Sequence, residues 1–183
     1  MRGVGHARSA LRPAFAYRSY AALGVLGCIV SDIGKIIESK LLDLVGFLKE
    51  PKWFGRENEL VNLFAHSFLA QEIDQSRIGI EVAVKQLPRT GAKMLGRKDL
   101  VIWHNPNETV WINGVPSNDP AAVVEFKAND HRLCTGDITW LCNFTSRHPA
   151  VVGFSVCSLI CKDRGIVFTR VANGVAGELQ QYV

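Results

Sequence analysis

Two charged side chains lie in an otherwise apolar stretch near the middle of the chain, AAVVEFKA at residues 121–128. Because side chains alternate between the two faces of a strand, Glu125 and Lys127 share one face and Phe126 takes the other. Burying two charges in an apolar strand is costly unless other groups pair with them. A divalent metal ion and a phosphate would provide such partners, so the stretch points to phosphodiester chemistry.

A second carboxylate, Asp99, opens the apolar run at residues 100–103. If the strands of Asp99 and Glu125 are neighbours, both carboxylates converge at one end of the sheet, where they can hold Mg²⁺. A nearby lysine, Lys127, can orient or deprotonate the attacking water. Glu59, at the acidic start of a predicted helix, is the candidate for a third acidic group, and Glu57 is the alternative.

The Glu-x-Lys spacing is not specific by itself, since Glu38-Ser39-Lys40 has the same spacing. That copy falls on a predicted amphipathic helix, where side chains two positions apart do not share a face. Only Glu125 and Lys127 combine an apolar strand with an aspartate at the start of an earlier strand. The alternative interpretation of this group is a surface ion pair between strands at a sheet edge.

A run of basic residues precedes Asp99 without any acidic residue between them: Lys85, Arg89, Lys93, Arg97 and Lys98. Pro88, Gly91 and Gly96 predict that residues 87–98 form a loop leading into Asp99. A basic loop beside a metal site can bind the phosphates of a nucleic acid. A solvated hairpin is the alternative.

Taken together, Asp99 followed by Glu125-x-Lys127, with an acidic helix before and a helix and strand after, resembles the PD-(D/E)xK nuclease superfamily over residues 55–171. The resemblance implies that Asp99, Glu125 and the backbone carbonyl of Phe126 bind Mg²⁺ or Mn²⁺. It implies that Lys127 acts on the attacking water and that Glu59 assists at the metal. It also implies a homodimer acting on DNA, with RNA left open as substrate. Lys98 stands where the family name has proline.

The remaining elements follow from hydrophobic periodicity. Helical spacing predicts helices over residues 33–48, about 56–71 and about 130–146. Strands are predicted at 78–85, 100–103, 121–128, 151–161 and 165–171, with a shorter one at 109–112. This order predicts an α/β (α+β) fold with a central mixed β-sheet flanked by helices, and the resemblance makes it a restriction-endonuclease-like three-layer core.

The 183 residues suffice for one domain with a sizeable core. Residues 1–31 contain four arginines and no acidic residue, whereas residues 32–183 hold 17 basic and 17 acidic residues. We therefore expect a basic N-terminal extension at 1–31, either disordered or helical, and a single endonuclease-like domain at 32–183. No run of 18 apolar residues occurs, so no membrane span is expected.

The five cysteines show neither a CxxC pair nor a histidine at zinc-finger spacing. An odd number of cysteines without a framework favours a reducing compartment, so we expect a cytoplasmic protein. Cys157 and Cys161 flank an apolar run and are interpreted as small buried apolar residues.

These observations favour a metal-dependent endonuclease-like protein that hydrolyses phosphodiester bonds in DNA. The alternative is a non-catalytic nucleic-acid-binding or oligomeric scaffold domain with the same fold. No GxxxxGK[ST], HExxH or GxSxG sequence occurs, which argues against nucleoside-triphosphatase, zinc-protease and serine-hydrolase functions.

Overall fold

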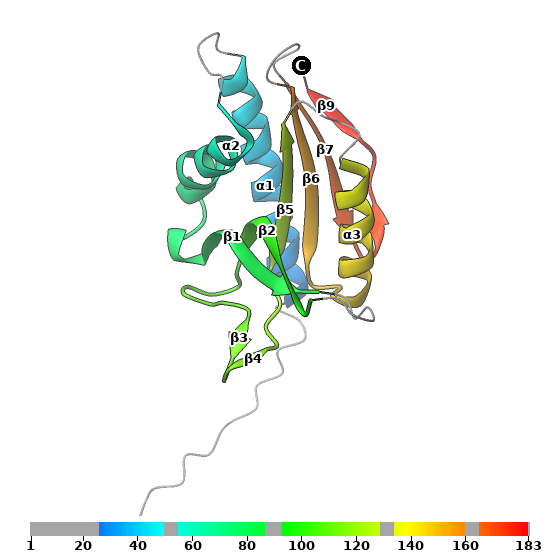
Figure 1. The fold of residues 1–183 in the computed structure, drawn as a ribbon. Helices are drawn as coiled ribbons and strands as arrows, with labels where there is room; N and C mark the ends of the chain where they lie inside the picture. The colour runs from blue at the N-terminus through cyan, green and yellow to red at the C-terminus, as the bar shows by residue number, and fades with distance from the viewer. Residues whose placement is uncertain (1–25, 50–54, 87–92, 129–133, 160–164, 183) are drawn as a thin grey trace, which may run out of the picture.

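A mixed β-sheet lies at the centre of the protein, between helices on both of its sides (Figure 1). The computed structural model describes residues 26–49, 55–86, 93–128, 134–159 and 165–182. For residues 26–32 it describes the backbone only. The strand order is β1-β2-β5-β6-β7-β8, and β9 also pairs with β7. These strands are β1 (Ile78–Lys85), β2 (Leu95–Ile102), β5 (Ala122–Ala128), β6 (Val152–Leu159), β7 (Gly165–Ala172), β8 (Val175–Ala176) and β9 (Gln180–Tyr182). The predicted mixed α/β architecture is confirmed.

The connections follow from the strand directions. β5 and β6 are parallel, whereas the other neighbours in the sheet are antiparallel. Parallel neighbours need a crossover, and α3 (Cys134–Arg147) lies in that connection. A small separate hairpin of β3 (Trp111–Ile112) and β4 (Val115–Pro116) stands between β2 and β5 in the chain. Asn113 and Gly114 at its tip have φ values of 51° and 77°, the left-handed pair that a type I′ turn needs.

The helices on the other side of the sheet from α3 are α1 (Leu26–Leu48) and α2 (Glu57–Leu63). α2 continues into the π-helical segment η1 (Phe64–Phe68) and the 3₁₀ turn η2 (Leu69–Gln71), and η3 (Gln75–Arg77) leads into β1. The helix predicted over residues 56–71 is therefore helical throughout most of its length, but it is regular α-helix only in its first part.

Two apolar cores join the three layers. The larger core packs α1 and α2 against the sheet, with Leu41, Phe64 and Phe126 fully buried. The smaller core packs α3 against the opposite face through Leu141 and Phe144. Phe126 points into the larger core, so its two charged neighbours on β5 face the α3 side, as the period of a strand predicts.

Some predicted boundaries were wrong. The predicted loop at 87–98 is in part strand, because β2 begins at Leu95 and pairs with β1 up to Lys85. Residues 87–92 lie outside the described residues. The short strands β4, β8 and β9 were not predicted. α1 begins at Leu26, inside the predicted extension at 1–31, of which residues 1–25 lie outside the described residues.

Within the part of the chain that the structure describes, every helix is too short or too polar to cross a membrane.

Candidate active site

Asp99 lies where β2 separates from β5. The antiparallel ladder between these strands ends with the pair Leu100 and Val124. In place of the next rung, Asp99 Oδ2 accepts a hydrogen bond from the backbone N–H of Phe126 at 2.7 Å. The two strands are neighbours in the sheet, which is the condition for Asp99 and Glu125 to converge, although the two residues are 26 positions apart in the chain. The β3–β4 hairpin lies within that separation, in the connection from β2 to β5.

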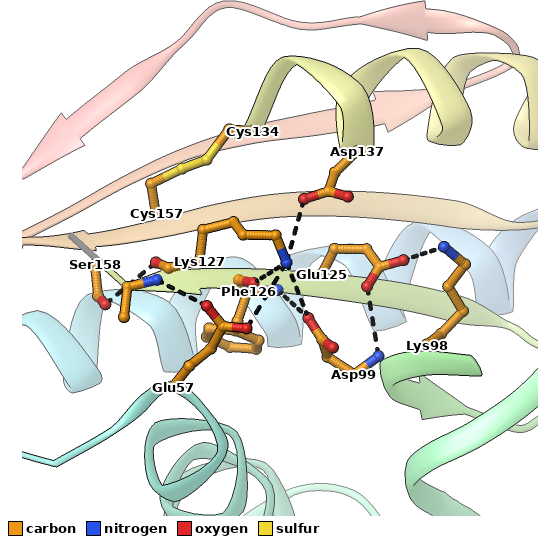
Figure 2. Close-up of polar contacts among 11 residues, drawn as sticks. Glu57, Lys98, Asp99, Glu125, Phe126, Lys127, Cys134, Asp137, Cys157 and Ser158 are labelled. Carbon is orange, nitrogen blue, oxygen red and sulfur yellow. Dashed lines mark hydrogen bonds and ion pairs between the residues drawn. A yellow bond between two sulfur atoms is a disulfide. The ribbon is translucent and has the colours of Figure 1, made fainter. Parts of the chain in front are cut away.

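Lys127 lies among three carboxylates (Figure 2). Its Nζ is 3.6 Å from Asp137 Oδ2, 3.8 Å from Glu57 Oε1 and 3.9 Å from Asp99 Oδ2. It also donates a hydrogen bond to the carbonyl oxygen of Phe126 at 2.7 Å. The carboxylates come from α3, α2 and β2, so both helical layers and the sheet contribute one each. Four oxygen atoms therefore surround a single cation.

The electrostatics of this cluster hold Lys127 in its charged form. Burial lowers the pKa of its ammonium, but the carboxylates of Asp137, Asp99 and Glu57 outweigh burial, and the net shift is upward. Burial raises the pKa of Asp137 in spite of the Lys127 ammonium nearby. Asp137 Oδ2 is buried and has no hydrogen-bond partner among the described residues, because at 3.6 Å its contact with Nζ is an ion pair only.

Glu125 faces the same side of the sheet as Lys127 but pairs with a different lysine. Lys98 Nζ contacts Glu125 Oε1, and the Asp99 N–H points at Oε2 from 3.5 Å. The Lys98 ammonium also lies 3.6 Å from the centre of the Trp140 ring, a cation–π contact. Glu125 is 5% exposed, and burial raises its pKa to about 7 despite Lys98. In this arrangement its carboxylate is enclosed.

Of the two glutamates at the start of α2, the structure brings Glu57 to the cluster. Glu57 Oε2 accepts a hydrogen bond from the Ala128 N–H at 3.0 Å, at the end of β5. Glu59 instead accepts a hydrogen bond from the Arg56 N–H at 2.7 Å, so its carboxylate caps the start of its own helix. The structure therefore does not bring Glu59 together with the other predicted site residues, and the alternative, Glu57, takes its place.

Asp137 is the site residue that sequence reasoning missed. It lies in the first turn of α3, where an acidic residue is also favoured by the helix dipole, so its type alone carries no functional signal. The position of Asp137 in the fold does carry a functional signal. The crossover helix runs back over β5, so its first turn lies beside the end of that strand, where Lys127 is. An acidic residue there is within reach of the motif.

The donor set suits a divalent ion in its chemistry. Asp99, Glu57, Asp137 and the Phe126 carbonyl offer only oxygen atoms, which Mg²⁺ and Mn²⁺ prefer. In this structure the four oxygen atoms surround the Lys127 ammonium instead. Among the described residues no group of three His, Cys, Asp or Glu side chains is arranged to hold a metal ion. A cation at the centre of this group would take the place of the Lys127 ammonium.

The predicted phosphate-binding residues separate into two groups. Lys85 forms an ion pair with Asp119 at 2.6 Å, and Lys98 is buried against Glu125, so both are engaged within the protein. Lys93 and Arg97 are exposed. Arg89 lies outside the described residues.

Cys134 and Cys157 form a disulfide beside this cluster, which the sequence did not predict. The two residues are 23 positions apart and lie on α3 and β6, so no local spacing in the sequence predicts that they pair. Cys157 is buried, as expected, whereas Cys161 lies outside the described residues.

The second Glu-x-Lys sequence behaves as its helical position predicts. Glu38 pairs with Arg170 on β7 at 3.2 Å. Lys40 is buried elsewhere on α1, where it donates to Gln71 at 3.1 Å. The two side chains share no site.

Comparisons with known proteins place the chain in no family, since no family model, no curated protein and no solved structure matches it.

Proposed function

We propose that the protein is a metal-dependent nuclease with a restriction-endonuclease-like fold, hydrolysing phosphodiester bonds in DNA. The observation that carries this proposal is the position of Lys127, whose ammonium lies within 4 Å of carboxylates from three separate elements. A structural ion pair needs one carboxylate. Three of them around one partly buried lysine leave an excess of negative charge, which suits a site that exchanges the lysine for a divalent ion.

In this proposal Asp99, Glu57, Asp137 and the Phe126 carbonyl hold Mg²⁺ or Mn²⁺, which supplies charge stabilisation and an activated water when bound. Asp99 is oriented for this role by the Phe126 N–H. Lys127, whose pKa the surrounding carboxylates raise in the metal-free protein, would donate a hydrogen bond to the attacking water or to a phosphate oxygen. Glu125, the ligand that the family resemblance implies, must first release Lys98.

The partners follow from the same proposal. Among the described residues of the β1–β2 region, Lys93 and Arg97 are exposed and can contact a phosphate backbone. Cleavage of RNA, assembly into a homodimer and a cytoplasmic location remain predictions from the sequence.

Plasmid cleavage tests the proposal. Supercoiled plasmid is incubated with the protein and Mg²⁺ or Mn²⁺, and nicking is quantified against a chelator control. Lys127→Ala should lower the rate by about 100-fold or more, the usual effect of removing one hydrogen-bond donor that stabilises charge at the reacting group. Lys35→Ala, an exposed lysine on α1, is the matched control and should keep the rate. Unchanged nicking by Lys127→Ala would show that the activity belongs to another site or to a contaminant.

The choice between the two glutamates of α2 has its own test. Glu57→Gln should weaken Mn²⁺ binding, measured by calorimetry, by about tenfold or more, because one charged ligand is lost. Glu59→Gln keeps a side-chain oxygen for the helix cap and should weaken binding much less. Equal or reversed effects of the two substitutions would remove Glu57 from the site.

The second candidate function is a non-catalytic domain with the same fold. The enclosed position of Glu125 and the lack of a preassembled metal group in the described residues favour it. Absence of Mn²⁺ binding that depends on Asp99 would decide for this function.

A further inference from the structure

The Cys134–Cys157 disulfide lies directly beside the acidic cluster (Figure 2). Cys134 is the first residue of α3. Cys157 lies on β6 at the position paired with Lys127 of β5. The bond therefore connects the first turn of the crossover helix to the strand beside the lysine of the candidate site.

Asp137 depends on the placement of that same turn, because it lies three residues after Cys134 in α3. It is the only one of the three carboxylates around Lys127 that α3 supplies among the described residues. Its Oδ2 is buried without a hydrogen-bond partner in that part of the chain, so no polar contact of that atom fixes the side chain other than the ion pair with Lys127.

The rest of α3 is held by different contacts. Leu141 and Phe144 pack in the core with Val123, one to two turns further along the helix. Cys134 and Cys157 belong to a separate small cluster with Leu159 and Val167. Loss of the disulfide would therefore loosen the first turn while the later turns stay anchored in their own core.

We propose that the Cys134–Cys157 disulfide is a redox-sensitive positioning device, which holds Asp137 against Lys127 and releases it on reduction. Its effect on cation binding rests on the proposed nuclease function, whereas its effect on the first turn of α3 and on Lys127 does not. Asp137 acts here as a positioning residue for Lys127 as well as a cation ligand.

The chemistry of the switch is thiol–disulfide exchange. A small dithiol attacks one sulfur, the S–S bond breaks, and a mixed disulfide forms. The second thiol of the reagent then displaces the remaining protein sulfur. Two electrons and two protons pass to the protein, which holds two thiols, and the reagent becomes a cyclic disulfide. Both cysteines are buried, so the reaction requires opening of the first turn of α3.

The test compares oxidised and dithiol-reduced protein, with the disulfide verified by mass spectrometry of non-reduced peptides. On reduction, amide exchange in residues 134–138 should rise at least tenfold, while exchange around Phe144 should stay the same. Acylation of Lys127 by an amine-reactive reagent should become several-fold faster, since the 22% exposed side chain loses the carboxylate beside it. The affinity for Mn²⁺ should fall about tenfold.

Three variants separate the proposal from a general loss of stability. Cys157→Ser should resemble the reduced protein, and addition of the dithiol should not change its amide exchange, its Lys127 acylation or its Mn²⁺ affinity. Cys142→Ser removes the free cysteine of α3 and should respond like the parent protein. Asp137→Asn should still lose several degrees of melting temperature on reduction, but its Mn²⁺ affinity and its Lys127 acylation should no longer change.

The outcomes are distinct. The proposal is overturned if oxidised protein lacks the Cys134–Cys157 bond, or if reduction lowers the melting temperature without changing Lys127 acylation. Oxidised protein that binds no Mn²⁺ contradicts the nuclease function, and the exchange and acylation measurements then still decide whether the bond positions Asp137.

Discussion

The two lysines of the candidate site are held by different surroundings. Lys98 is clamped between the Glu125 carboxylate and the ring of Trp140. Lys127 lies among longer ion pairs, none closer than 3.6 Å. At the residue scale, Lys98 is thus closely paired with one carboxylate, whereas Lys127 is shared among three carboxylates at longer distances. The sequence placed Lys98 among phosphate contacts because a basic run does not show which of its members are buried.

Glu125 gives a pH prediction for the metal-free protein. Burial raises its pKa from the ordinary 4.5 to about 7. As the pH rises from 4.5 to 7 the unfolded chain releases this proton first, so the folded state loses stability across that window and the loss is complete above pH 7. The shift corresponds to a decrease on the order of 3 kcal/mol in the free energy of unfolding.

Glu125→Gln removes this titration, and urea unfolding at several pH values measures the difference. The free energy of unfolding of the parent protein should fall more steeply than that of Glu125→Gln between pH 4.5 and 7. Parallel profiles for the two proteins across this window would show that the folded carboxyl titrates at its ordinary pKa.

At the scale of elements, the contact between α3 and the sheet decides where Asp137 lies. Gly153 on β6 provides room for this contact, because a Cβ there would meet Leu141 Cδ2 at 2.8 Å. Gly136 in the first turn of α3 has nothing within 4 Å of such a Cβ. Substitution of each glycine by alanine should therefore change the free energy of unfolding in opposite directions.

Gly153→Ala should destabilise the protein by about 1–3 kcal/mol, since an extra methyl group overpacks the α3 layer. Gly136→Ala should stabilise it by up to about 1 kcal/mol, because alanine is the better helix former and the site is open. Chemical unfolding of both variants measures this. A neutral Gly153→Ala would mean that α3 packs less closely on β6 than the structure shows.

At the scale of the whole molecule, each of the three layers brings one carboxylate to Lys127. α1 and α2 pack on one face of the sheet through the larger core, while α3 packs on the other. Glu57 reaches the end of β5 from the first side, and Asp137 approaches from the second. The cluster is therefore complete only when all three layers are assembled.

Substitutions in α1 test whether these layers unfold together. Leu41 is fully buried and its neighbour Leu42 is 43% exposed. Leu41→Ala should cost about 2–5 kcal/mol of unfolding free energy, and Leu42→Ala about 0.5 kcal/mol or less. For Leu41→Ala, the midpoints by circular dichroism and by tryptophan fluorescence, to which all four tryptophans contribute, should shift equally. Separate midpoints would show that the protein does not unfold in a single step.

Much of the local structure is determined by the sequence itself. The helical stripe at 33–48, the alternation at 78–85 and the apolar strand at 121–128 all appear where hydrophobic period predicts them. The same period places Glu125 and Lys127 on one face of β5 and Phe126 on the other. These features depend on residues that are close together in the sequence, so they can be predicted from the local sequence.

The tertiary structure alone decided which charged groups meet. Glu57 rather than Glu59 joins Lys127, because Glu59 caps its own helix. Asp137 and the Cys134–Cys157 bond depend on how α3 crosses over β5 and β6, which no local pattern encodes. Glu125-Phe126-Lys127 is thus a motif that the sequence can propose, but its partners are set by contacts between residues as far apart as Glu57 and Ala128.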